Sequence, residues 1–186
     1  MKRAALFVII ALTPVAPAHA QEDSPSAAKL AAVASIDRHR AELITIADQI
    51  WEFAETALQE YRSAALLAEF AESQGFAVER GVAEMPTAFV ASYGSGRPII
   101  GVLGEYDALP GISQKAQSTK EPFEEGAAGH GCGHNLFGAA SLGAALAIKE
   151  LIAAEHDVDE DEERARGGSM SLCFIRRMIW REPARI

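Results

Sequence analysis

The spacing of apolar side chains predicts two amphipathic helices in the N-terminal half of the chain. From about Ala31 to Glu55, apolar residues recur three, four and seven positions apart, which places them on one face of a helix. A second helix is predicted from about Tyr61 to Gln74, and Gly75 after it suits a left-handed cap. The apolar positions of the two helices are Ile36, Leu43, Ile46, Ile50, Phe53, Leu66, Leu67 and Phe70.

Short apolar stretches after the helices predict β-strands. Residues 76–82 (FAVERGV) alternate between apolar and polar, and Thr87–Tyr93 is rich in strand-forming residues. Ile99–Leu103 is a continuous apolar run, which is typical of a buried strand. The turn-forming residues between the last two segments predict that these form a hairpin or lie side by side.

A long polar loop and an apolar helix are predicted to follow. Residues 111–129 are polar and glycine-rich, and Asn135 can cap a helix that is rich in alanine and glycine and ends near Glu155. The small residues predict close packing of this helix, and a sheet is the expected surface. The order helix–helix–strand–strand–loop–helix predicts an α/β or α+β layered fold.

The first twenty residues have the layout of a secretory signal peptide. Lys2 and Arg3 precede an apolar run from Ala4 to about Leu12, and residues 18–20 (AHA) form a small-x-small cleavage site. The run is shorter than a membrane span, and we expect no later apolar segment long enough to cross a bilayer. We therefore expect cleavage rather than a retained anchor, a flexible start over residues 21–30, and export to the bacterial periplasm.

The charge of the mature chain argues against anionic partners. Loss of Lys2 and Arg3 leaves 15 basic and 26 acidic residues, a net charge of 15 − 26 = −11. A chain this acidic has no electrostatic attraction for nucleic acid or anionic lipid, and its body contains no basic stripe. The 166 residues that remain are enough for one domain with a hydrophobic core.

The stretch HGCGHN, residues 130–135, concentrates groups that bind metals. In an extended segment Cys132 and His134 point to the same side, so a thiolate and an imidazole can reach one cation. Zinc, cobalt and nickel accept such mixed ligands, although a complete site needs further ligands from elsewhere. Two alternatives are a disulfide between Cys132 and Cys173 and a catalytic thiol with His134 as its base.

Two acidic residues follow the predicted strand Ile99–Leu103. Ligands of open α/β sheets bind beyond the carboxyl ends of strands, where Glu105 and Asp107 are expected to lie. There they could ligate a metal directly or orient a ligating imidazole. Taken alone, an acidic pair at a strand end is more often a solvated surface feature.

These motifs together resemble a known enzyme family. GVLGEYDALPGISQ (residues 101–114), then GHGCGHNLFGAA (129–140) with its apolar helix, are similar to the metal-dependent amidohydrolase and peptidase family of carboxypeptidase G, aminoacylase and the indole-acetyl-amino-acid hydrolases, and within it to the branch that hydrolyses aminobenzoyl-glutamate. The similarity runs from about Ile36 to about Glu155 and includes WEFAETALQEYRSAALLAEF (51–70). It implies that residues 31–155 are the N-terminal part of a zinc-peptidase-like α/β catalytic domain, a mixed sheet flanked by helices.

The resemblance implies roles for five residues. Cys132 and His134 match the family's Cys-x-His metal ligands, and Asp107 matches an aspartate that supports catalysis from beside the metal. Glu105 stands where other branches have a histidine or an aspartate, and His130 matches the leading histidine of the motif; both are candidate ligands. The implied cofactor is a divalent metal: zinc, or else manganese, cobalt or nickel. The implied reaction is hydrolysis of an amide bond in an N-acyl or N-aroyl amino acid or a dipeptide, with a glutamate as general base, and full-length members are expected to be homo-oligomers.

That glutamate is absent from its expected place. In the family it belongs to a Glu-Glu-Gly motif one strand after the helix that follows Cys-x-His, but residues 156–186 contain no such motif. Residues 124–126 read Glu-Glu-Gly but precede Cys132, so we do not transfer the role of general base to them. We interpret residues 156–186, an acidic block and a basic stretch, as an atypical tail from a shifted reading frame or a premature end. The chain is then expected to be an inactive hydrolase, or a non-enzymatic remnant with a weak metal half-site.

Overall fold

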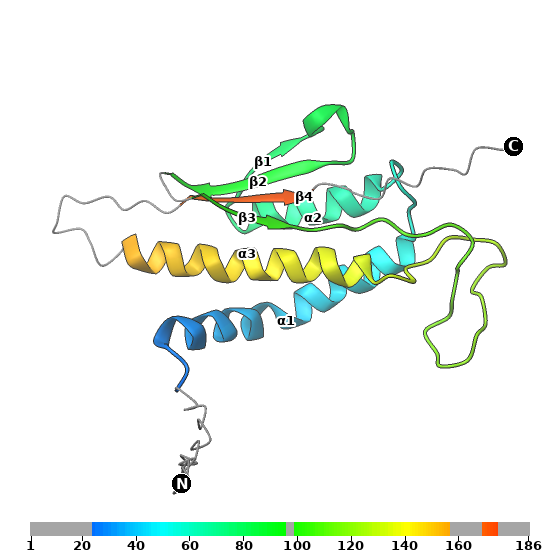
Figure 1. Cartoon of the computed structure of the whole chain (residues 1–186), viewed down its shortest axis with the longest axis horizontal. Coiled ribbons are helices and arrows are strands. Elements are labelled where there is room, and N and C mark those ends of the chain that lie inside the picture. Colours follow the sequence, from blue (N-terminus) through cyan, green and yellow to red (C-terminus); the bar gives the residue numbers. More distant parts are fainter. Residues whose placement is uncertain (1–23, 96–98, 157–168, 175–186) are drawn as a thin grey trace, which may run out of the picture.

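In the part of the chain that the structure describes, three helices pack with a four-stranded sheet (Figure 1). The structure is a computed structural model, and it describes residues 24–95, 99–156 and 169–174. The predicted helices and strands form within a few residues of their expected bounds. In chain order the elements are α1 (Ala27–Phe53), α2 (Tyr61–Ser73), β1 (Ala77–Arg80), a 3-10 turn (Val82–Glu84), β2 (Phe89–Gly94), β3 (Ile99–Leu103), α3 (His134–His156) and β4 (Ser169–Phe174).

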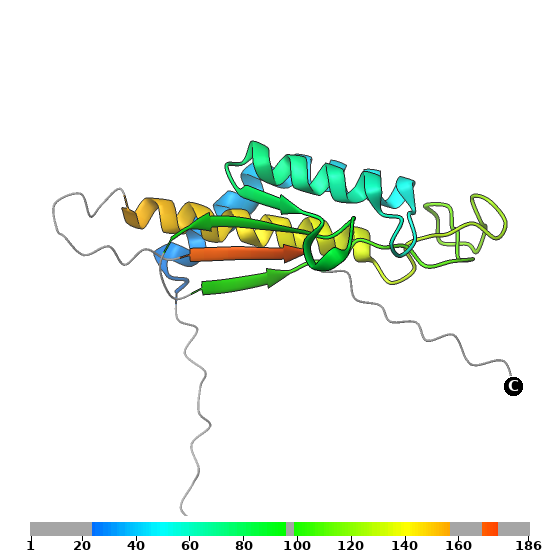
Figure 2. The ribbon, with the colours of Figure 1, turned by 90° about the horizontal axis from the view of Figure 1, so that it is seen from above.

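The sheet is mixed, and its last strand in sequence lies inside it. The strand order is β1-β2-β4-β3, and β4 runs antiparallel to β2 and parallel to β3. Ser169, at the start of β4, faces Gly94 on one side and Ile99 on the other. The expectation that the second and third strands form a hairpin or lie side by side is therefore wrong, because β4 lies between them (Figure 2).

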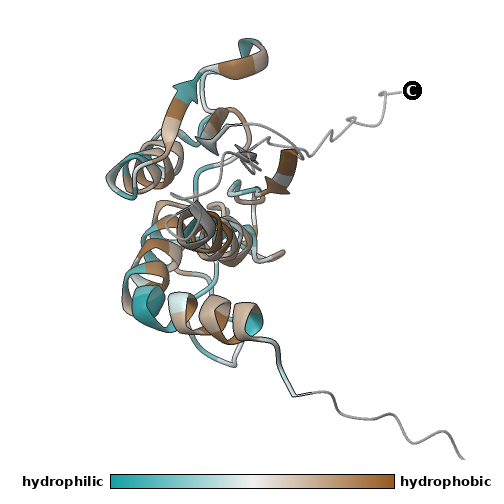
Figure 3. Ribbon diagram, turned by 90° about the vertical axis from the view of Figure 1, so that its left-hand side faces the viewer, coloured by the Kyte–Doolittle hydropathy of each residue, from teal (hydrophilic) through white to brown (hydrophobic). Residues whose placement is uncertain are grey.

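The helices cover one face of the sheet. α2 packs on β1 and β2, α3 packs on β2, β3 and β4, and α1 packs on α3 in a further layer (Figures 1 and 3). Gly143 allows α1 to approach α3, because a Cβ there would lie 2.9 Å from Leu43 Cδ1. A mixed sheet flanked by helices is thus confirmed, and its core includes Ile46, Ile50, Leu67, Phe70, Phe89, Leu142 and Leu146.

Local hydrogen bonds set the boundary between the first two helices. α1 ends where Ala54 adopts a left-handed conformation (φ 44°). The next residue, Glu55, caps α2, since its carboxylate accepts hydrogen bonds from the backbone N–H groups of Arg62 (3.0 Å) and Ser63 (2.8 Å). Gly75 is left-handed after α2 (φ 83°), as predicted.

A buried carboxylate ties the start of α2 to the sheet. Glu60 is fully buried and accepts hydrogen bonds from the Thr87 hydroxyl (2.8 Å) and the Leu58 N–H (2.9 Å). Tyr106 donates its hydroxyl to the Thr87 carbonyl, and burial, with the charges of nearby carboxylates, raises the pKa of Tyr106 above its usual range. These contacts fix the segment after β3 against the body of the fold.

A partly exposed ion pair links α1 and α3. The Glu150 carboxylate pairs with Arg38 and lies 3.4 Å from His39 Nε2. Burial raises the pKa of Glu150, but the nearby Ser35 hydroxyl, the hydrogen bond with His39 and the charge of Arg38 together outweigh burial, so the pKa lies below its usual range. The pair adds a pH-dependent contact to the apolar packing of the two helices.

β3 is less covered than its sequence predicts. Ile99 and Leu103 are 58% and 47% exposed and Ile100 is also exposed, so the expectation of a buried strand is wrong. β3 lies at an edge of the sheet, and among the described strands only β4 pairs with it. Parallel strands are normally covered on both faces, so β3 leaves apolar surface and unpaired backbone groups open to association.

α3 is a core helix that departs from two sequence expectations. Asn135 does not cap it; the Asn135 amide donates to the Ala47 carbonyl (3.2 Å) and so ties α3 to α1. By length and composition, His134–Ala154 is apolar enough to cross a membrane (mean hydropathy 1.6), so the expectation that no later segment is long enough is wrong. In the structure the helix packs between α1 and the sheet, which accounts for its apolar composition.

Several sequence-based expectations concern residues outside the described part of the chain. The signal peptide (1–20) and the beginning of the flexible start (21–30) lie there, as do residues 157–168 and 175–186. β4 falls within residues 156–186, which we interpreted from sequence as an atypical tail. The sheet therefore extends past the boundary placed at residue 155.

Candidate metal centre

The segment that follows β3 is held next to the start of α3. The Ala108 N–H donates to the Glu55 carbonyl (2.7 Å), and Leu109 exchanges two backbone hydrogen bonds with Gly129 (2.9 and 3.0 Å). Gly138, in the second turn of α3, allows close approach, because a Cβ there would lie 3.0 Å from the Glu105 carbonyl oxygen. The strand end and the helix start are thus brought together by backbone contacts.

His134, the first residue of α3, lies between two carboxylates. Its Nδ1 is 2.8 Å from Asp107 Oδ1, and its Nε2 is 3.1 Å from Glu105 Oε2. The Asp107 side chain is only 2% exposed, and those of His134 and Glu105 are mostly buried. The structure therefore brings together three of the five residues that the sequence singled out.

The two contacts orient the imidazole. A carboxylate at Nδ1 holds a proton there, which leaves the Nε2 lone pair directed toward Glu105. A nitrogen and a carboxylate oxygen that approach each other in this way are donors that one divalent cation can share. Without a cation the same contact requires a proton between the two atoms, so cation and proton compete for the position.

Cys132 is close to His134 in sequence but does not join the cluster of His134, Asp107 and Glu105. The segment is not extended as expected: Gly133 is left-handed (φ 79°) and its N–H donates to the His130 carbonyl (3.4 Å). Cys132 is free and exposed, so the disulfide alternative is not realised. The thiol alternative finds no support in the contacts of His134, because both of its ring nitrogens face carboxylates.

His130 is anchored to α1 instead of to the carboxylates. Its Nε2 lies 3.0 Å from the Ile50 carbonyl oxygen, and burial lowers the pKa of His130, which keeps the ring neutral. With the proton on Nε2, the buried Nδ1 carries a lone pair and has no hydrogen-bond partner among the described residues. The only ring nitrogen that could bind a ligand is therefore Nδ1.

The donors present are suited to one side of a divalent-metal site. Imidazole and carboxylate groups are ordinary ligands of zinc and related metals, and Asp107 supplies the outer contact that such an imidazole usually has. Within residues 24–95, 99–156 and 169–174, however, no group of three or more His, Cys, Asp or Glu side chains converges on one point. The described residues therefore account for part of a site.

The neighbouring strand end carries no acidic residue in sequence. β3 and β4 are parallel, and Leu103 is in register with Cys173, so the carboxyl end of β4 lies beside the strand that leads to Glu105. The resemblance places the Glu-Glu-Gly motif one strand after α3, which is β4. In sequence, β4 is followed by Ile-Arg-Arg-Met (residues 175–178), which contains no carboxylate.

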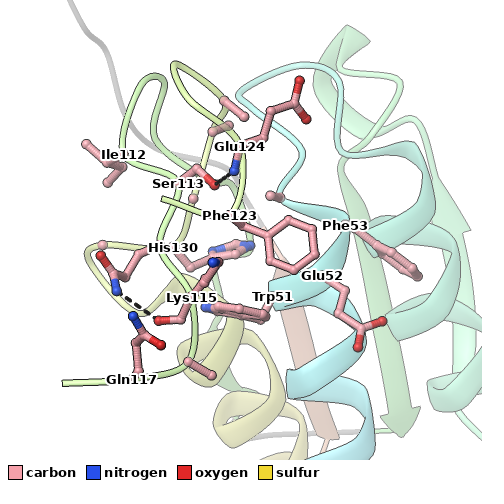
Figure 4. A pocket seen from close by; sticks show the side chains of 17 residues that line it. Trp51, Glu52, Phe53, Ile112, Ser113, Lys115, Gln117, Phe123, Glu124 and His130 are labelled. Carbon is pink, nitrogen blue, oxygen red and sulfur yellow. Dashed lines mark hydrogen bonds between the residues drawn. The ribbon is translucent and has the colours of Figure 1, made fainter. Parts of the chain in front are cut away.

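A cavity of about 740 Å³ borders this region, and the sequence did not lead us to expect it. It lies between the end of α1 and the loop that precedes Cys132, and Trp51, Phe123 and His130 are among the residues that line it (Figure 4). One signal was available: Trp51 lies next to Ile50, off the apolar face of α1, at a position where a large aromatic residue is not needed for the core.

Comparison with known proteins identifies related sequences. One of the subunits of the p-aminobenzoyl-glutamate hydrolase of Escherichia coli is 49% identical over 119 residues, which cover 63% of this chain and 25% of that protein. The Xaa-Arg dipeptidase of Homo sapiens is 31% identical over 134 residues, which cover 65% of this chain and 27% of that protein. The chain thus spans about a quarter of the length of these relatives, and no family model matches it.

Solved structures share the fold. A dinuclear metal-binding peptidase of the M20 family from Bacillus subtilis aligns with 74% of this chain and 35% of its own (TM-score 0.56, 20% identity). A protein described as a candidate aminohydrolase, from methicillin-resistant Staphylococcus aureus, aligns with 77% of this chain and 34% of its own (TM-score 0.58, 19% identity). At these identities the similarity to the solved structures concerns the fold. Common descent is indicated by the two sequence relatives. Over the segment that it shares with these proteins, the chain is therefore similar in sequence to a hydrolase subunit and a dipeptidase, and it has the fold of an M20-family metal-binding peptidase.

Proposed function

We propose that this chain carries one side of the metal site of a hydrolase that cleaves the amide bond of an N-acyl or N-aroyl amino acid. The observation that carries the proposal is the arrangement of His134 between Asp107 and Glu105. The 49% identity to the p-aminobenzoyl-glutamate hydrolase subunit of Escherichia coli supports an aminobenzoyl-glutamate-like substrate, with a dipeptide as the second candidate.

Each residue of the site has a distinct part in this proposal. His134 and Glu105 would hold a divalent metal, with Cys132 as a further ligand after rearrangement of the Gly133 turn. Such a metal, when bound, polarises an amide carbonyl and lowers the pKa of water. Asp107 keeps the proton on His134 Nδ1 and so keeps Nε2 available as a donor. Zinc is the metal we propose first, because its protein sites combine imidazole, carboxylate and thiolate.

We further propose that the 186-residue sequence does not itself turn over substrate. The residues that follow β4 include no Glu-Glu-Gly, so the general base that the family resemblance calls for is missing from the place where it is expected. The alternative function is a non-enzymatic chain that binds metal weakly through its half-site. Both functions predict metal binding without hydrolysis by this sequence alone, and they differ in whether the half-site belongs to a hydrolase.

Titration calorimetry with zinc and cobalt tests the metal site. We expect weak binding of one ion, lost in His134→Ala and weakened in Cys132→Ser, whereas His39→Gln, a histidine change on α1 away from the site, leaves it unchanged. Absence of binding to the wild-type chain, or binding indifferent to both site variants, would refute the proposal. Incubation with aminobenzoyl-glutamate or a dipeptide should give no hydrolysis; turnover that a chelator abolishes would show that the chain has its own base.

Export is a separate proposal, supported by the sequence of residues 1–20. Expression in a bacterial host should place the mature chain in the periplasm, with Gln21 as its first residue. Fractionation followed by N-terminal sequencing tests this. A chain that keeps residues 1–20 in the cytoplasm would contradict it.

A further inference from the structure

The cavity beside His130 has the size and walls of a small-molecule site. Its volume of about 740 Å³ falls within the range of roughly 300–1,000 Å³ that ligand pockets occupy. One wall is formed by residues 51–54, at the end of α1, and the other by residues 112–117, 123–124 and 127–131 of the loop (Figure 4). No residue of the proposed metal site lines it, although it reaches Gly131, the neighbour of Cys132.

The loop wall is held by backbone hydrogen bonds, although its sequence predicts only a polar loop. Beyond the Leu109–Gly129 pair, the Ser113 N–H donates to the Ala127 carbonyl (2.9 Å) and the Lys115 N–H to the Glu121 carbonyl (2.9 Å). The two arms also touch, because a Cβ on Gly129 would lie 2.6 Å from the Ile112 carbonyl oxygen. A wall fixed in this way spares a ligand the entropic cost of ordering it.

The side chains of the cavity favour a planar aromatic group. Trp51, Phe123 and His130 present three ring systems around it, and Phe123 is 76% exposed, so a large apolar surface is left for a ligand to cover (Figure 4). Phe53 also lines the cavity, but the Arg62 guanidinium stacks on its ring at 3.8 Å.

The polar groups of the cavity favour an uncharged part of a ligand that carries a hydrogen-bond donor. Lys115 is neutralised by its ion pair with Glu121, and the carboxylates of Glu52 and Glu124 would repel an anion. His130 Nδ1 has a lone pair and no partner in the described part of the chain. A buried acceptor of this kind is usually satisfied by a water or a ligand. An N–H group on the ligand would satisfy it.

We propose that this cavity binds the aromatic acyl group of an N-aroyl amino acid, with its ring against Trp51 and Phe123 and an N–H donated to His130. The inference rests on the proposed function for the identity of the substrate, but binding of the aryl group itself requires no metal. Since His130 precedes Cys132 by two residues and His134 by four, an aryl group held here leaves the rest of the substrate to extend toward the metal centre.

Ligand-observed NMR on the full chain, with a chelator present, tests the proposal. N-(4-aminobenzoyl)glutamate should bind and N-acetylglutamate should not. Phe123→Ala and Trp51→Leu should each weaken binding about three- to tenfold, the range expected for loss of one aromatic contact. Tyr61→Ala removes another exposed aromatic ring, which lies on α2 outside the cavity, and should leave the affinity unchanged. His130→Phe keeps the ring but removes the acceptor, and it should weaken binding of the amine-bearing ligand more than binding of ring analogues without an N–H.

The outcomes separate this inference from the proposed function. Aryl binding that persists without metal and depends on Phe123 and Trp51 supports the cavity, whatever the metal titration shows. Equal binding of the aryl and acetyl compounds, or equal effects of Tyr61→Ala and Phe123→Ala, would overturn it. Metal binding that depends on Cys132, together with no aryl binding, would overturn the cavity and leave the metal site in place.

Discussion

Asp107 is the residue whose replacement tests the metal centre most directly. It is 2% exposed and accepts a 2.8 Å hydrogen bond from His134 Nδ1, so its carboxylate orients the His134 imidazole. Asp107→Asn keeps the shape and an acceptor oxygen but removes the charge. A charge-assisted hydrogen bond contributes about 1.5–3 kcal/mol against about 0.5–1.5 for a neutral one, so the substitution costs the metal-bound imidazole about 1.4 kcal/mol, or about tenfold in affinity.

The assay is calorimetric titration with zinc or cobalt on folded protein. We expect the dissociation constant to rise about tenfold in Asp107→Asn and about 10- to 100-fold in Asp107→Ala, which removes the orienting contact entirely. Asp37→Asn removes the same charge from the exposed side of α1 and should have no effect. Dissociation constants within about twofold of wild type for both Asp107 variants, with circular dichroism showing native fold, would refute the reasoning that Asp107 acts through His134.

Three further predictions concern the fold. Glu60→Ala leaves the buried Thr87 hydroxyl and the partly buried Leu58 N–H without their acceptor and should lower the free energy of unfolding by about 3 kcal/mol in urea denaturation, whereas a loss below about 1 kcal/mol would show that water reaches the site. Because the pKa of Glu150 is lowered, its contribution is present above pH about 4.3 and is lost as the pH falls through the folded-state pKa. Glu150→Gln should therefore cost about 0.5 kcal/mol at pH 7, through the pair with Arg38, and nothing at pH 2; equal costs at both would contradict this assignment. Ile100→Lys on the exposed edge strand β3 should reduce self-association in sedimentation experiments, and unchanged sedimentation would show that the chain does not associate through this edge.

Local patterns account for what the sequence predicted well. The bounds of α2 and β3 came from apolar periodicity and from Gly75, because these features depend on neighbours in the chain. The pairing of β3 was mistaken because its partner lies more than sixty residues later, in a segment that has no recognisable period. Long-range register of this kind leaves no local trace.

The candidate metal site likewise combines features that local sequence patterns predict with features that they do not. The rule that ligands collect at strand ends placed Glu105 and Asp107 near His134, and the structure brings the three together. The exposed position of Cys132 depends on the left-handed Gly133, which a sequence pattern cannot specify. The cavity escaped prediction because its walls come from α1 and from a loop some sixty residues later, which are unrelated by any motif.

The central place of β4 sets an order of events for folding. Until Ser169–Phe174 is in position, β2 and β3 face each other across a gap of about 10 Å, twice the spacing of neighbouring strands, and neither has its hydrogen-bonding partner there. Closing so long a loop is slow. Until it closes, the slot between β2 and β3 can pair with any extended peptide whose side chains suit the sheet. The nascent chain is therefore most exposed to strand exchange and chaperone capture just before its sheet closes, and a synthetic SMSLCF peptide should compete with β4 for the slot during refolding.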